Sequence, residues 1–177
     1  MQRQFSAAAI VLSFPLVLGA AESTGDLSLD NGVKVPIPSP GYTWQKVRET
    51  DAGVVPKVQI YSASKEGTTA NVVLIFEQTT ADTDAQKLAR IKGDYNGMVS
   101  SLKDQGYTEL KAVPPPLVPP IPDRVTFSIT GKAGDGSPAA FGTTIVFGKK
   151  GVYHFQVHAG TDAEVKELSK IAETLKE

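Results

Sequence analysis

Alternation of apolar and polar residues predicts the first long strands of this chain. Residues 42–49 alternate imperfectly around Tyr42 and Trp44, whereas residues 55–64 alternate well. We therefore predict a strand in each segment. Residues 71–78, NVVLIFEQ, form a continuous apolar run of strand length, which predicts a central strand that is covered on both faces.

Turn residues delimit the other predicted strands. Within residues 26–37, Asp30-Asn31-Gly32 separates two short alternating runs, which indicates a hairpin or the beginning of a strand. Alternating prolines at positions 36–40 confine the next segment to a sheet edge or an extended loop, because proline cannot donate to a strand ladder. Three further strands, separated by glycine-containing turns, are predicted as a meander at residues 124–130, 140–147 and 152–158.

Two segments repeat their apolar residues with helical spacing. The first helix is predicted over residues 84–105, with a capping-box pattern at 83–86 and Gly106 suited to the left-handed residue after a helix. The second helix is predicted over residues 162–176, with a similar pattern at 161–164. Both helices are therefore marked at their beginnings as well as by their periodicity.

Gly93 and Gly97 interrupt the first predicted helix one turn apart. Each costs about 1 kcal/mol relative to alanine in a helix interior, so we expect a compensating reason for their presence. We favour close packing of a neighbouring segment against the helix. The functional alternative is a pocket between this helix and the sheet that accepts a small ligand.

The order of these elements predicts an α+β fold in a single domain over residues 22–177. Short turns favour an antiparallel sheet of about six to seven strands. The long mid-chain helix and the C-terminal helix are expected to pack on this sheet. Because the strand at 71–78 is apolar on both faces, we expect the helices to cover opposite faces.

The first 21 residues have the pattern of a secretory signal peptide. Arg3 precedes an apolar run from Ala7 to Leu18, and small residues follow through Ala21. This run is shorter than the ~20 residues that span a bilayer as a helix, so we predict cleavage after Ala20 or Ala21 and no stable membrane anchor. Ala21 stands where a lipobox would have its cysteine, which excludes lipidation by that route. We expect a soluble exported protein, in the bacterial periplasm or secreted.

Composition and charge narrow the possible functions. The 177 residues are 41% apolar and 21% charged, with 18 Lys+Arg against 19 Asp+Glu and no cysteine. A net charge near zero gives little electrostatic attraction to nucleic acid, so we expect no nucleic-acid partner. Without cysteine there are no disulfides, thiolate zinc sites or cysteine nucleophiles. We also expect no cofactor.

His154 and His158 are the only histidines, and their spacing invites a metal-site hypothesis. Their segment alternates as a strand, however, and four strand residues span about 13 Å, too far for two ligands that each lie about 2.1 Å from one ion. Alternation places both rings with Gln156 on one face, opposite Tyr153 and Phe155. We predict that the two histidines are solvated or locally hydrogen-bonded on the exposed face of the strand, and we assign no metal site. No catalytic grouping of serine, aspartate and histidine can be assembled from the sequence, so no catalytic residue is assigned.

A run of prolines between residues 114 and 122 predicts an extended, polyproline-like segment. One interpretation is a stiff spacer that returns the chain from the helix to the sheet. In the functional interpretation, Leu117, Val118 and Ile121 form an exposed docking ridge. A preformed extended segment loses little entropy in either role.

Three stretches give the chain a resemblance to the PsbP-like superfamily, which covers most of residues 27–177. They are the PSPGYTW sequence at 38–44, the apolar run at 71–78 leading to the helix that ends at Gly106-Tyr107, and GVYHF at 151–155 before the last helix. Leu175 replaces a phenylalanine that is frequent in the family, and the proline run is an elaboration. The resemblance implies an α/β sandwich that acts mainly through partners rather than catalysis. The resemblance assigns no functional residue of the family to a position in this sequence.

Together these features predict a soluble exported binding or accessory protein that acts through a protein partner in the cell envelope and catalyses no reaction. The first alternative is a small apolar-ligand carrier with its pocket around Gly93 and Gly97. The second is a hydrolase, which would need a serine or carboxylate site that leaves no trace in the sequence.

Overall fold

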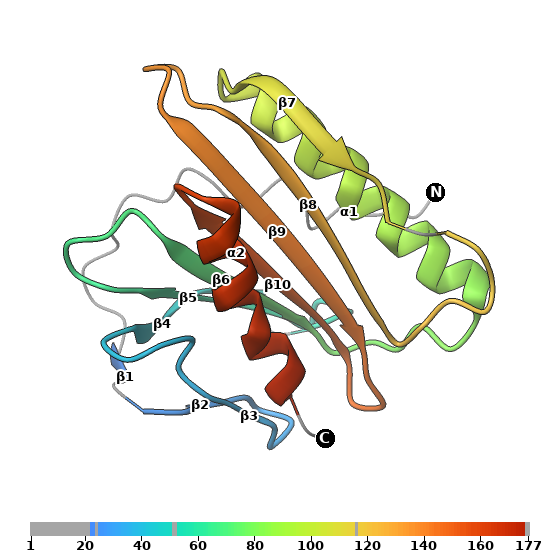
Figure 1. Cartoon of the computed structure of the whole chain (residues 1–177). Coiled ribbons are helices and arrows are strands. Elements are labelled where there is room, and N and C mark those ends of the chain that lie inside the picture. The colour runs from blue at the N-terminus through green and yellow to red at the C-terminus, as the bar shows by residue number, and fades with distance from the viewer. Residues whose placement is uncertain (1–21, 24, 51–52, 116, 176–177) are drawn as a thin grey trace.

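The computed structural model describes residues 22–23, 25–50, 53–115 and 117–175. The predicted signal peptide, residues 1–21, lies outside the described residues. The expected α+β class is confirmed, because an antiparallel sheet is combined with a mid-chain helix and a C-terminal helix (Figure 1).

One antiparallel sheet contains all the long strands, and two-residue β1 extends its edge. A separate two-stranded ribbon, β2–β3, carries the turn predicted at Asp30-Asn31-Gly32. The central position predicted for residues 71–78 is confirmed, because β6 pairs with both β5 and β10. In sheet order the strands are β1 (Glu22–Ser23), β4 (Thr43–Glu49), β5 (Val58–Ser64), β6 (Asn71–Glu77), β10 (Val152–Ala159), β9 (Pro138–Phe147), β8 (Arg124–Lys132) and β7 (Thr108–Val113); the ribbon consists of β2 (Leu27–Ser28) and β3 (Lys34–Val35).

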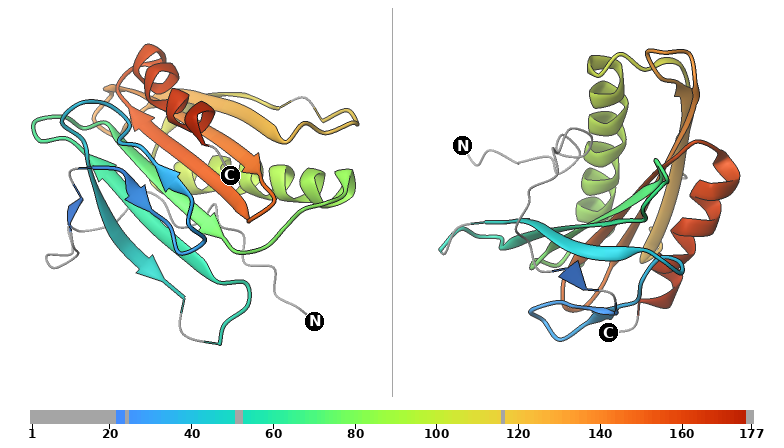
Figure 2. Two further views of the ribbon diagram at one scale, coloured as in Figure 1. Left: turned by 90° about the horizontal axis from the view of Figure 1, so that it is seen from below. Right: turned by 90° about the vertical axis from the view of Figure 1, so that its left-hand side faces the viewer.

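Helices cover opposite faces of this sheet, as expected from the apolar character of β6 (Figure 2). Helix α1 (Asp84–Asp104) packs Ile91 and Met98 against side chains of β8 and β9. Helix α2 (Asp162–Ser169) continues as a 3-10 turn over Lys170–Thr174 and packs on the other face against β10. The C-terminal helix is thus shorter than the predicted 162–176.

The strand β7 was absent from the sequence prediction. Leu110 and Ala112 face the core while Lys111 and Val113 are exposed, so the segment does alternate. The alternation is too short and too polar to distinguish a strand from a loop, and a bulge between Thr108 and Lys111 interrupts its pairing with β8. The proline run therefore joins two neighbouring strands rather than returning the chain directly from the helix.

The capping box predicted at the beginning of α1 is present. The Thr83 hydroxyl accepts a hydrogen bond from the Gln86 amide, and the Gln86 side chain accepts one from the Thr83 amide. We expect Thr83→Ala to lower the free energy of unfolding by about 1 kcal/mol, because an orphan helix amide loses its acceptor. Thr83→Ser keeps the acceptor and is the control. Urea denaturation measures both, and equal losses in the two variants would contradict a capping role.

Candidate functional site

The histidine face of β10 lies against the protein interior, so the prediction of a solvated face is wrong. His154 is 0% exposed, and Gln156 is also buried. The alternation correctly placed these side chains on one face, opposite Tyr153 and Phe155. Alternation does not specify, however, which face of a strand is exposed to solvent. In this protein α1 covers the face that carries the polar residues.

Four charged side chains meet beneath α1, and we call them the buried charge cluster: Glu77, Arg90, Asp94 and His154. The Nδ1 atom of His154 lies 2.7 Å from Oδ2 of Asp94, and its Nε2 atom lies 3.3 Å from Oε1 of Glu77. Both are ion-pair contacts without hydrogen-bond alignment. Arg90 Nη1 lies 2.8 Å from Oε2 of Glu77 and donates to Oε1 at 2.9 Å.

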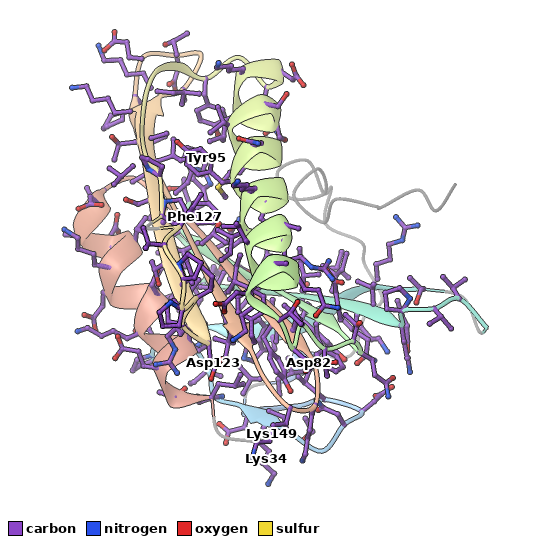
Figure 3. The ribbon with its side chains drawn as sticks, turned by 90° about the vertical axis from the view of Figure 1, so that its right-hand side faces the viewer. Lys34, Asp82, Tyr95, Asp123, Phe127 and Lys149 are labelled. Carbon is purple, nitrogen blue, oxygen red and sulfur yellow. The ribbon has the colours of Figure 1, made fainter. Side chains whose placement is uncertain are left out.

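The cluster joins α1 to the two central strands. Arg90 and Asp94 lie one helical turn apart on α1, Glu77 ends β6, and His154 lies on β10. Glu77, Asp94 and His154 are buried, and Arg90 is partly exposed. Figure 3 shows α1 and α2 on opposite sides of the sheet. Chain segments far apart in the sequence are therefore held together by charge at the centre of the sheet.

Sequence reasoning missed this cluster, although one signal was visible. Asp94 falls within the apolar stripe of α1, on the same side as Ile91 and Met98. A carboxylate at such a position is expected to have a buried partner, because a buried charge without one is very costly. His154, taken as a solvated residue, is that partner.

Burial and the two carboxylates act in opposite directions on the pKa of His154. Burial lowers it, but the carboxylates of Asp94 and Glu77 outweigh burial and raise the pKa of His154 from 6.5 to about 9. For Glu77, burial raises the pKa, and the contacts with His154 and Arg90 leave it below its usual value. At neutral pH His154 is therefore an imidazolium and Glu77 a carboxylate.

This arrangement is unsuited to general-base catalysis. A catalytic histidine needs one ring nitrogen directed at the reacting group, as in a triad. In this protein a carboxylate lies against each ring nitrogen of His154, and the ring is protonated at neutral pH and enclosed. The contacts instead form an ion-pair network that fixes α1 to the sheet, and we call this role of the buried charge cluster the latch.

His158 is half-buried, so it is less solvated than predicted but not enclosed as His154 is. Its ring stacks on Phe141 with centroids 4.7 Å apart, and the Tyr107 ring meets it edge-on at 6.4 Å. Burial lowers the pKa of His158. His154 and His158 lie four residues apart on β10, and their pKa values are shifted in opposite directions.

The predicted docking ridge is only partly exposed. Val118 is 77% exposed, whereas Ile121 is 3% exposed and Leu117 is partly buried against the core. The described residues between β7 and β8 lie in neither a helix nor a strand, and their three apolar side chains differ in exposure. Ile121 and Leu117 instead anchor the segment, and Val118 remains on its surface.

Gly93 and Gly97 lie half-buried on α1, on either side of Asp94 in the sequence. The structure therefore places this part of the helix close to His154, through the contact of Asp94. The ligand pocket expected around these glycines stays a prediction.

No protein-family model matches this sequence, and no curated protein is significantly similar to it. Among the described residues, no three potential metal ligands gather as an ion would require. The described helices also include none that is both long and apolar enough to cross a membrane.

Proposed function

We propose that this protein is an exported binding or accessory protein that recognises a protein partner through the segment between β7 and β8. The observation that carries the proposal is an exposed apolar surface on a chain segment fixed at several points. We call this surface the proline ridge; its exposed residues are Val113, Pro114, Val118, Pro119, Pro120 and Pro122.

Contacts with the core and with α1 hold the ridge in place. Pro115 is buried, and Leu117 packs against the core cluster beneath α1. Buried Ile121 donates its amide hydrogen to Oδ1 of Asp84 at 3.1 Å. On the same helix, Lys87 forms an ion pair with Asp123. The ridge is thus anchored within its exposed part and directly after it.

A fixed apolar ridge favours a binding role over a spacer role. A spacer needs no exposed large apolar side chains, yet Val113 and Val118 are both mostly exposed. Because proline already restricts the backbone, binding costs little further conformational entropy. Proline-rich extended segments typically bind grooves lined with aromatic side chains, which is the partner surface that we propose.

The buried charge cluster supports the same proposal. His154, whose pKa is raised to about 9, contacts Asp94 and Glu77 and so holds α1 to the sheet rather than facing a substrate. The resemblance to the PsbP-like superfamily, which rests on sequence motifs, also favours action through partners. We include export to the bacterial periplasm or medium in the proposal because of the signal pattern at residues 1–21.

Site-specific crosslinking tests the proposal. A photo-crosslinking residue replaces Val118 in the full chain, expressed in the organism of origin, and Val55 carries it in the control. Val55 is a suitable match because it is 89% exposed and lies in a different loop. We expect a discrete adduct with an envelope protein from position 118 and none from position 55.

Competition then tests whether the adduct reflects specific binding. Val118→Asp in otherwise native protein is expected to compete at least tenfold less well than the native chain, because it introduces a charge into an apolar interface. Equal adducts from positions 55 and 118, or no adduct from 118, would contradict recognition through the ridge.

A further inference from the structure

A groove runs beside α2 on the face of the sheet opposite α1. Helix α2 covers β9 and β10 but leaves the outer part of β8 open (Figure 1). The groove has a volume of about 350 Å³. Gly142 lies on the floor of the groove and allows α2 to approach closely, because a Cβ at this position would be 2.5 Å from Cγ1 of Val165. Its volume lies at the small end of the range for ligand sites.

Hydroxyl groups line the groove. Thr126 and Ser128 on β8 contribute to it, together with Thr144 on β9 and Ser169 on α2. The Oγ1 atoms of Thr126 and Thr144 are 3.0 Å apart and share one hydrogen bond. Each hydroxyl has one donor and two acceptor positions, so this pair retains capacity for a ligand. The apolar cluster under α2 thus gives way to a polar surface at β8.

Three basic and two acidic side chains line this groove, whereas the whole chain has a net charge of −1. Arg124, Lys166 and Lys170 line it, against Asp162 and Glu173. Lys166 pairs with Asp162 at 2.7 Å, and Lys170 pairs with a glutamate outside the groove. Arg124 has no ion-pair partner among the residues that the structure describes, so its guanidinium is available at the end of the hydroxyl row.

We infer that this groove binds a small hydroxylated carboxylate, such as a sugar acid. The guanidinium of Arg124 presents a planar pair of donors that matches a carboxylate, and Lys166 and Lys170 add positive charge along the helix side. Thr126, Ser128 and Thr144 supply donors and acceptors for the ligand's own hydroxyl groups. This site is distinct from the proline ridge and does not depend on the function proposed for it.

A titration of the full chain, followed by amide NMR, tests this inference. Four probes separate the contributions: galacturonate has both the charge and the hydroxyls, galactose has the hydroxyls alone, and acetate and inorganic phosphate have charge with few or no such groups. We expect saturable shifts at Thr126, Ser128 and Thr144 with galacturonate, and at least tenfold weaker binding of the other three probes.

The variants Arg124→Gln and Arg48→Gln complete the test. Arg124 is exposed, so its replacement should not unfold the chain. Arg124→Gln is expected to weaken galacturonate binding at least tenfold, through loss of a charge-assisted pair. Arg48 lies on β4, away from the groove, and Arg48→Gln should bind as the native chain does. Absent or non-saturating shifts, equal binding of galactose, tighter binding of phosphate, or unchanged binding by Arg124→Gln would each overturn the inference.

Discussion

Replacing His154 with leucine is expected to lower the free energy of unfolding by about 3–5 kcal/mol, the cost of removing one partner from a buried ion pair. The substitution leaves the Asp94 carboxylate buried without the imidazolium that lies 2.7 Å from it. Glu77 retains Arg90, so Asp94 accounts for most of the loss. Chemical denaturation of the native and variant chains measures the difference.

His158→Leu provides a matched control on the same strand. Its half-buried ring stacks on Phe141 and has no carboxylate partner among the described residues, so we expect a loss of about 1 kcal/mol or less. Adding Asp94→Leu to His154→Leu should recover much of the lost stability, because apolar replacement of a whole buried pair is often neutral. Similar losses for the two histidine variants would contradict the latch.

The unfolding free energy of the native chain is expected to fall as the pH rises from 6.5 to about 9. The pKa of His154 is about 9 in the folded state against 6.5 for the unfolded reference, so the folded chain binds more protons within this interval. The stabilisation is complete below pH 6.5 and is lost as the pH rises through the folded value. Its magnitude is on the order of 3 kcal/mol.

Two other groups with shifted pKa values act outside this interval. The pKa of Glu77 on β6 is lowered, so its contribution is present above 4.5 and lost as the pH falls. His158 also has a lowered pKa, so its contribution is lost below 6.5. Denaturation from pH 6.5 to 9 therefore isolates His154, and the curve for His154→Leu should be nearly flat. An equal decline in that variant would assign the pH dependence to other groups.

Much of the fold follows from local patterns in the sequence. The two-sided apolar run of β6 indicated its central position, and the capping box at Thr83 located the beginning of α1. Periodicity and caps act over a few residues, so a sequence displays them directly. The short, polar β7 lacks a comparable signal, because its strand conformation depends on pairing with β8.

The candidate site depended on contacts that local patterns do not specify. Alternation on β10 placed His154 correctly relative to Tyr153, yet burial was decided by α1, which begins 70 residues earlier in the chain. The docking-ridge interpretation required Ile121 to be exposed, but it is buried and donates its amide hydrogen to Asp84, 37 residues away in the sequence. Long-range packing thus decided which polar and apolar side chains are buried.

A heteronuclear NMR titration of the His154 ring most directly tests whether the buried charge cluster fixes α1 to the sheet. In this account His154 has a structural role, and the surface of the protein recognises the partner. The chain has two histidines, so His158→Leu assigns the signals. We predict protons on both ring nitrogens at pH 7 and a titration midpoint near the folded pKa of about 9. A midpoint near 6.5, with one ring nitrogen unprotonated at neutral pH, would contradict the latch and make His154 a candidate base.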